Sequence, residues 1–174
     1  LIPLAFYLTQ FLIDFAAAKF ADRIGYRFCV AASQVLSAVG LALLTILPEL
    51  LPVPFAGILI SVVLYAMGSG LIEVLISPIV EACPFENKAG MMSLLHSFYC
   101  WGAVGVILCS TLFFAAFGTE NWKILTLIWA AVPLLNTFNF ISCPIERTVE
   151  AGESMRPGQL FRLPLFWLLV LVMA

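Results

Sequence analysis

The segment Phe55–Val80 reads FAGILISVVLYAMGSGLIEVLISPIV and contains a single charged residue, Glu73. This stretch is longer than the roughly 20 apolar residues that an α-helix needs to cross the hydrocarbon core of a bilayer. Inside lipid every backbone N–H and C=O group must be bonded within the segment, so an isolated run of this kind forms a helix. The stretch therefore predicts a membrane-spanning helix.

The rest of the chain has the same character. Of its 174 residues, 63% are hydrophobic and 10% are charged, whereas a soluble domain is near half apolar and a quarter charged. Further runs of spanning length, give or take a few residues, are Leu1–Ala18, Phe28–Leu47, Gly90–Phe117 and Ile124–Cys143, and Leu163–Ala174 is about half as long as a span. These runs predict an all-α, polytopic transmembrane helical bundle.

Both ends of the sequence lie in apolar runs, at Leu1 and Ala174. We therefore expect a chain that is cut at both ends, without a cleavable signal, whose helices pack against the remainder of the same protein. The net charge of −2 argues against a nucleic-acid partner, which would require a basic face.

The five cysteines and the single histidine do not form a ligand pattern, because no Cys-x-x-Cys occurs. We expect reduced cysteines, no metal site and no cofactor.

Basic residues lie mainly in alternate connecting segments. Segments 19–27, 81–89 and 144–162 together contain Lys19, Arg23, Arg27, Lys88, Arg147, Arg156 and Arg162, and the two other connections contain only Lys123. Cytoplasmic loops of membrane proteins carry the excess of Lys and Arg. We therefore expect these three segments to be cytoplasmic in a multi-pass plasma-membrane protein.

Glu73 lies in the most polar row of the predicted helices. Side chains at every fourth position, which lie on neighbouring faces of a helix, are Ser61, Tyr65, Ser69, Glu73 and Ser77. An ionisable residue at mid-membrane costs roughly 2.5–3.5 kcal/mol on insertion scales and usually marks a functional site. The row is interpreted either as the wall of a water-filled cavity or as a polar seam between packed helices.

Asp14 and His96 are the other ionisable residues within the predicted spans. Counted from the segment ends at 1.5 Å per residue, Asp14, Glu73 and His96 lie at similar heights. His96 is interpreted either as a buried histidine bonded to a carbonyl or as a proton-relay partner of Glu73. Asp14, together with Gln10, is a candidate for a polar contact between helices.

Other polar and aromatic residues receive separate interpretations. Asn136 and Asn139 suit hydrogen bonds between helices, and Trp122 suits the membrane interface. Tyr65, Tyr99 and Trp101 are candidates for contacts with a solute, because aromatic rings offer apolar faces and polar edges.

The stretch Ala18-Lys-Phe-Ala-Asp22-Arg23-Ile-Gly25-Tyr-Arg27 resembles the loop signature of the major facilitator superfamily, Gly-x-Leu-Ala-Asp-Arg-x-Gly-Arg-Arg/Lys. Asp22, Arg23, Gly25 and Arg27 match it, whereas alanine replaces the first glycine and tyrosine a basic residue. In the family this motif is a cytoplasmic charge network that changes during alternating access.

The resemblance implies a domain organisation for the whole chain. It would make residues 1–143 helices 2–6 of an N-terminal bundle, 144–162 the central cytoplasmic loop, and 163–174 the truncated start of helix 7.

A narrower likeness joins Gly70-Leu-Ile-Glu73-Val-Leu-Ile-Ser77-Pro78 and Ser93-Leu-Leu-His96-Ser97-Phe. These stretches resemble helices 4 and 5 of the fucose/glucose permease-like branch. There a helix 4 glutamate serves substrate binding and proton coupling, which implies this role for Glu73.

The sequence therefore leads us to expect a secondary transporter, not an enzyme, that carries a small polar solute such as a sugar together with H+. A drug or metabolite efflux antiporter of the same fold is the main alternative. An intramembrane serine hydrolase would use Ser69 and His96 as a dyad, but it leaves the charged loop unexplained. A non-transporting receptor or scaffold of the same fold is a further alternative.

Overall fold

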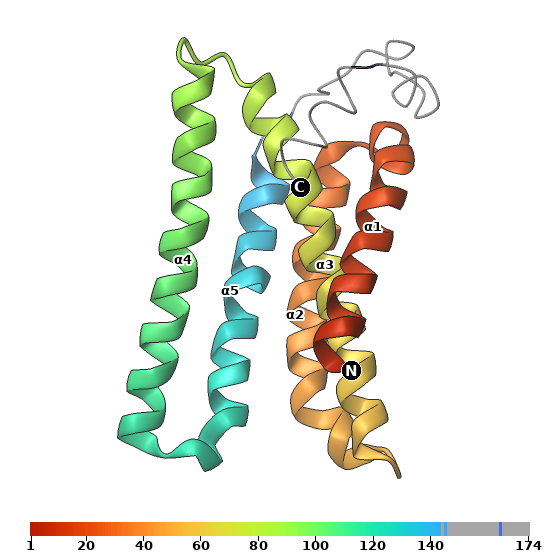
Figure 1. The fold of residues 1–174 in the computed structure, drawn as a ribbon, viewed down its shortest axis with the longest axis vertical. Coiled ribbons are helices and arrows are strands. Elements are labelled where there is room, and N and C mark those ends of the chain that lie inside the picture. The colour runs from red at the N-terminus through yellow and green to blue at the C-terminus, as the bar shows by residue number, and fades with distance from the viewer. Residues whose placement is uncertain (144, 146–163, 165–174) are drawn as a thin grey trace.

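The computed structural model describes residues 1–143, 145 and 164, without the side chains of residues 18, 19, 22 and 23. This part of the chain consists of five long α-helices and one short 3-10 helix, η1 (Figure 1). They are α1 Ile2–Ile24, α2 Tyr26–Leu50, α3 Pro54–Ala82, α4 Lys88–Phe117, η1 Thr119–Asn121 and α5 Trp122–Ser142. Within the described residues there is no strand, so the expected all-α class is confirmed there. The expected loop 144–162 and helix start 163–174 lie outside the described residues, apart from 145 and 164.

The helix ends follow from local chemistry. Gly25 (φ 105°) and Gly118 (φ 82°) adopt backbone conformations that L side chains rarely adopt, and each ends a helix. Pro54 is the first residue of α3, a position where its missing N–H has no helical partner to lose. The side chain of Asn87 accepts a hydrogen bond from Gly90 N at 2.9 Å and caps α4.

Two predicted connections are shorter than the sequence pattern indicated. The segment 19–27 is helical up to Ile24, and Gly25 alone separates α1 from α2. Lys and Arg have good helix propensity, so the charged residues mark the end of the apolar run and not the end of the helix. The segment 48–54 is helical up to Leu50, because Leu51 N still bonds Leu47 O at 3.0 Å beyond Pro48.

The helices alternate in direction, and α2 lies at the centre of their packing (Figure 1). It packs extensively against α3 and α5, while α1 packs mainly against α3. α4 has few contacts with the other helices and no buried residue. The described core therefore lies among α1, α2 and α3, where one cluster of buried apolar residues contains Ala17, Ala21, Cys29, Val30, Leu71 and Leu75.

Four helical segments in the described residues are long and apolar enough to cross a membrane, namely Tyr26–Leu50, Pro54–Ala82, Lys88–Phe117 and Thr119–Ser142. The apolar part of α1, Ile2–Ala17, is shorter than these spans. Of the five predicted full spans, four are thus confirmed, and the helical segment Ile2–Ala17 corresponds to the fifth, Leu1–Ala18. Large apolar side chains are exposed on all five helices, as expected for a bundle whose solvent is lipid.

Candidate functional site

A polar contact joins α1 to α3 at an exposed part of their interface. The side-chain amide of Gln10 on α1 donates a hydrogen bond from Nε2 to Oε2 of Glu73 on α3. Gly70 allows this approach, because a Cβ atom built there would lie 3.1 Å from Gln10 Cγ. The sequence pattern suggested His96 as the partner of Glu73, but the hydrogen bond comes from Gln10, 63 positions away.

Asp14 lies one helical turn beyond Gln10 and faces the same part of α3. Its Oδ1 atom would be 3.1 Å from a Cβ atom at Gly70, which lies three residues before Glu73 on α3. Oδ1 is buried and accepts no hydrogen bond within the described part of the chain. Asp14 thus lies against α3 near Glu73 without a hydrogen bond to Oδ1 among the described residues.

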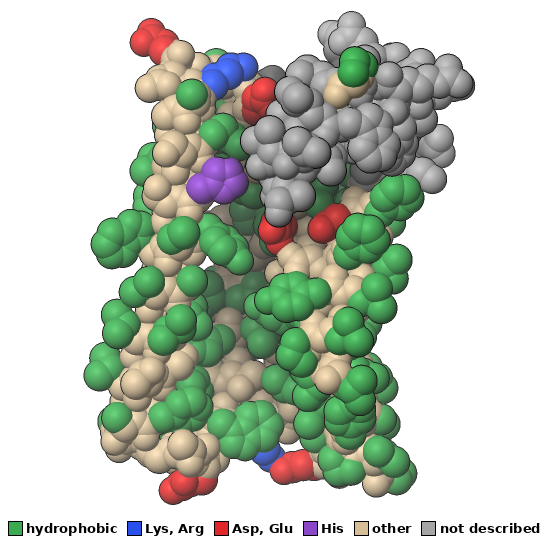
Figure 2. Space-filling view, in the orientation of Figure 1, with side chains coloured by type: hydrophobic (Ala, Val, Ile, Leu, Met, Phe, Trp, Pro, Cys, Tyr) green, Lys and Arg blue, Asp and Glu red, His purple; other side chains and the backbone are tan. Residues whose placement is uncertain are grey.

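Glu73 also opens onto a cavity of about 520 Å³ between α3 and α4. Its polar lining residues are Ser69, Glu73, Ser77, His96 and Tyr99. Figure 2 shows the one histidine of the chain on the α4 side of an open hollow, with acidic side chains opposite. Five residues that the sequence singled out thus share one cavity, in the size range of small-molecule sites.

A second cavity, of about 460 Å³, adjoins the first at Ser69 and Ile72, which line both. Tyr65 lines this second cavity and not the first, together with Gln34 and Trp129. Neither Gln34 nor Trp129 was predicted from the sequence. The sequence does contain a signal for Gln34, because it is an amide within an apolar run. Trp129 is recognisable only in the structure, from the hydrogen bond that its Nε1 donates to Ser110 Oγ at 3.1 Å.

The row of polar residues on α3 is neither purely a cavity wall nor purely a seam. Successive members are four residues apart, about 400° of helical rotation, so the row turns by about 40° at each step. Ser61, at one end, is buried and its hydroxyl bonds back to Gly57 O at 2.9 Å. Ser69, Glu73 and Ser77 line the cavity beside α4. Both interpretations of the row therefore apply, each to a different end.

Four other candidate residues, Trp101, Asn136, Asn139 and Trp122, do not line these two cavities. Trp101 is 70% exposed and is not among the residues that line either cavity. Asn139 donates to Asn136 along α5 at 3.5 Å, a contact within one helix face. The expected hydrogen bonds from these two residues to other helices stay a prediction. Trp122 lies at the start of α5, with Lys123 Nζ 6.0 Å from its ring centroid.

Ser69 and His96, the residues of the hydrolase alternative, line the same cavity. No hydrogen bond joins them among the described side chains. A serine nucleophile requires such a bond to its base. The geometry therefore supports a binding cavity better than it supports a hydrolase.

The residues of the charged loop motif lie at the end of the bundle where α1 meets α2. Gly25 forms the turn, and Arg27 is exposed in the first turn of α2. Asp22 and Arg23 belong to the last turn of α1, and their side chains lie outside the described part. The same end holds the connection from α3 to α4 and the end of α5 (Figure 1).

Comparisons with protein-family models, with curated proteins and with solved structures found no match for this chain.

Proposed function

We propose that this chain is part of a secondary transporter of the major facilitator type. It would carry a small polar solute, such as a sugar, by alternating access and together with protons. The proposal rests on two features: the resemblance of residues 18–27 to the loop signature of that superfamily, and the polar cavity around Glu73. Of these, the second carries the mechanism.

The single observation behind the mechanism is the position of Glu73. On one side its carboxylate accepts a hydrogen bond from Gln10, and on the other it lines the 520 Å³ cavity with His96 and Tyr99. A charged group in hydrocarbon is expensive unless it faces a wet cavity or a partner. Because Glu73 lines a cavity and has a partner in Gln10, it is the residue at which the transported proton would bind.

Asp14 gives proton exchange at Glu73 a structural consequence. Asp14 and Glu73 both lie at the α1–α3 contact beside Gly70, and two like charges at one contact repel each other. A proton on Glu73 would remove that repulsion and would weaken the hydrogen bond from Gln10, because a neutral carboxyl group is a weaker acceptor than a carboxylate. Protonation would thereby change how tightly α1 and α3 are held together, which couples proton binding to a movement of helices.

The solute would bind beside Glu73. Tyr99 and Phe98 offer ring faces, and Ser69, Ser77 and His96 offer hydrogen-bonding groups in the same cavity. This combination of apolar faces with a few polar groups suits a neutral polyhydroxylated molecule. The same cavity would serve an exporter equally, so the proposal assigns the site and leaves the direction of transport to experiment.

The test is proton-driven uptake of a panel of radiolabelled monosaccharides by the full-length protein in proteoliposomes. In Glu73→Gln, which keeps the shape and removes the charge, accumulation driven by a pH gradient should fall to background. Glu81→Gln is the matched control, since Glu81 is an exposed acid near the end of the same helix, and it should transport normally. Undiminished accumulation in Glu73→Gln would remove this residue from the mechanism.

A further inference from the structure

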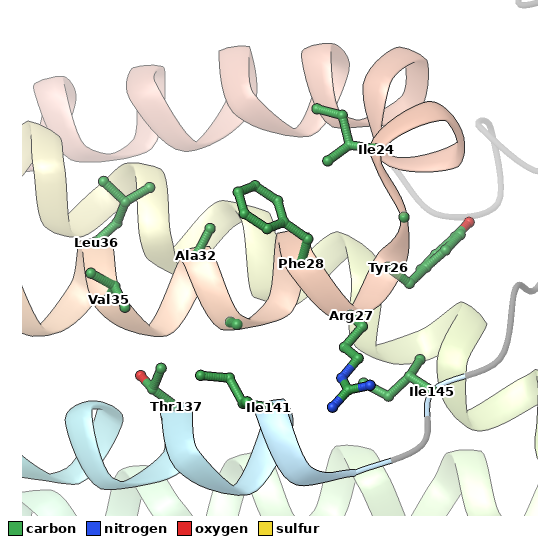
Figure 3. Close-up of a pocket in the computed structure, with 12 residues that line it drawn as sticks. Ile24, Tyr26, Arg27, Phe28, Ala32, Val35, Leu36, Thr137, Ile141 and Ile145 are labelled. Carbon is green, nitrogen blue, oxygen red and sulfur yellow. The ribbon is translucent and has the colours of Figure 1, made fainter.

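A groove of about 860 Å³ runs along the outside of α2 and α5, separate from the cavities around Glu73 (Figure 3). Its walls include Phe28, Ala32 and Leu36 from α2 and Ile141 from α5, and Ile24 at the end of α1 closes one end. Both helices that form it belong to segments long and apolar enough to span a membrane. The groove thus lies between two segments of spanning length, and its lining residues are separate from those of the Glu73 cavity.

The walls of the groove suit hydrocarbon. Ile24, Phe28 and Ile141 are 55%, 66% and 50% exposed. The hydroxyl of Thr137 donates to Pro133 O at 3.0 Å, so the polar side chain among the α5 lining residues has its donor already used. A flexible apolar chain in this groove is more stable than water there, because the walls offer few groups that can form hydrogen bonds.

Arg27 supplies the one charge among the lining residues. It lies in the first turn of α2 and extends between α2 and the end of α5, near Ile145 (Figure 3). The guanidinium is exposed, and no described carboxylate forms an ion pair with it. A planar guanidinium presents paired N–H donors that match a phosphate group.

The distances match one leaflet of a bilayer. Arg27 and Leu36 lie nine positions apart, which is about 13 Å along the helix axis. Half of a typical hydrocarbon core is about 15 Å. A phosphate on Arg27 would thus lie at the membrane surface while an acyl chain followed the groove inward.

We propose that the α2–α5 groove is a binding site for an anionic phospholipid. The headgroup phosphate, whose negative charge no choline group offsets in such a lipid, would bind Arg27, and one acyl chain would lie against Phe28, Ala32 and Leu36. Basic residues between membrane helices at the headgroup level are the usual means of holding anionic lipids. This inference is independent of what the protein transports.

The test is native mass spectrometry of the purified full-length protein with phosphatidylglycerol and phosphatidylcholine that carry identical acyl chains. The wild-type protein should retain the anionic lipid preferentially. Arg27→Gln should reduce that preference roughly tenfold, the size expected for a lost hydrogen bond between charged groups. Lys123→Gln is the control, because Lys123 lies at the opposite end of the bundle, bound to Glu49, and should leave the preference unchanged.

Two further arms distinguish a lipid groove from a site for soluble phosphate esters and from a contact between two copies of the chain. Ala32→Phe, which fills the groove without altering charge, should lower retention of both lipids. Glycerol 3-phosphate should not displace the bound lipid, and displacement would instead indicate a site for soluble phosphate esters. A preference for phosphatidylglycerol that persists unchanged in Arg27→Gln would overturn the proposal. A wild-type protein that forms dimers without retained lipid, and becomes monomeric in Ala32→Phe, would overturn it as well.

Discussion

At the scale of single residues, the proposed mechanism depends on what Glu73 contacts. Its carboxylate is held by Gln10 and lies near Asp14, whose Oδ1 is buried without a donor in the described part of the chain. A hydrogen bond to a charged group typically contributes about 1.5–3 kcal/mol. The orientation of Glu73 toward the cavity should therefore depend measurably on one amide of α1.

Replacement of that amide is the matching prediction. Gln10→Leu keeps the apolar volume and removes the donor, so we expect proton-driven uptake to fall by about tenfold, in line with the loss of one charged hydrogen bond. Thr9→Val, one position earlier on α1, should change uptake little. Initial rates measured over a range of solute concentrations would check this, and equal rates in both variants would show that Gln10 does not position Glu73.

At the scale of helices, three glycines set the packing of α2 against α3. A Cβ atom at Gly68 would lie 2.5 Å from the backbone oxygen of Ser33, and at Gly40 it would lie 2.5 Å from the backbone nitrogen of Tyr65. Gly57 is equally close to the backbone of Leu47. Small residues permit such close approach, and membrane helices depend on it because lipid provides no hydrophobic force between them.

The close approach predicts the effect of adding one methyl group. Gly68→Ala should lower the free energy of unfolding by about 1–3 kcal/mol, the usual range for overpacking, because backbone atoms of α2 must move. Gly105→Ala on α4 meets no atom within 4 Å and should be neutral or stabilising by up to about 1 kcal/mol through helix propensity. Unfolding titrations in sodium dodecyl sulfate would compare the two, and a neutral Gly68→Ala would contradict the observed packing.

The helices themselves were largely predictable from the sequence, but their partners were not. Long apolar runs predicted α2, α3, α4 and α5 to within a few residues, because lipid leaves no alternative to a helix. The end of α1 was missed, since charge interrupts hydropathy without breaking a helix at Lys19 or Asp22. The contact of Gln10 with Glu73 depends on how two helices cross, which no local pattern encodes.

At the scale of the whole molecule, the bundle is unevenly packed. α1, α2, α3 and α5 form the packed part, while α4 stands apart and no residue of it is buried (Figure 1). The cavity that contains Glu73 and His96 lies along this weakly packed side. A weakly packed side next to a row of polar residues is the arrangement that a water-filled passage requires. The groove between α2 and α5 has apolar walls instead.

The central claim is that the polar face of α3 borders water and that the outer faces of the helices border lipid. Ser69 and Val39 lie near the middle of α3 and α2, the first lining both cavities and the second 43% exposed on an apolar surface. The measurement is the reaction of a charged methanethiosulfonate with Ser69→Cys and Val39→Cys in a variant whose native cysteines are serine. The claim predicts rapid labelling of Ser69→Cys and none of Val39→Cys, and equal labelling or an unreactive Ser69→Cys would contradict it.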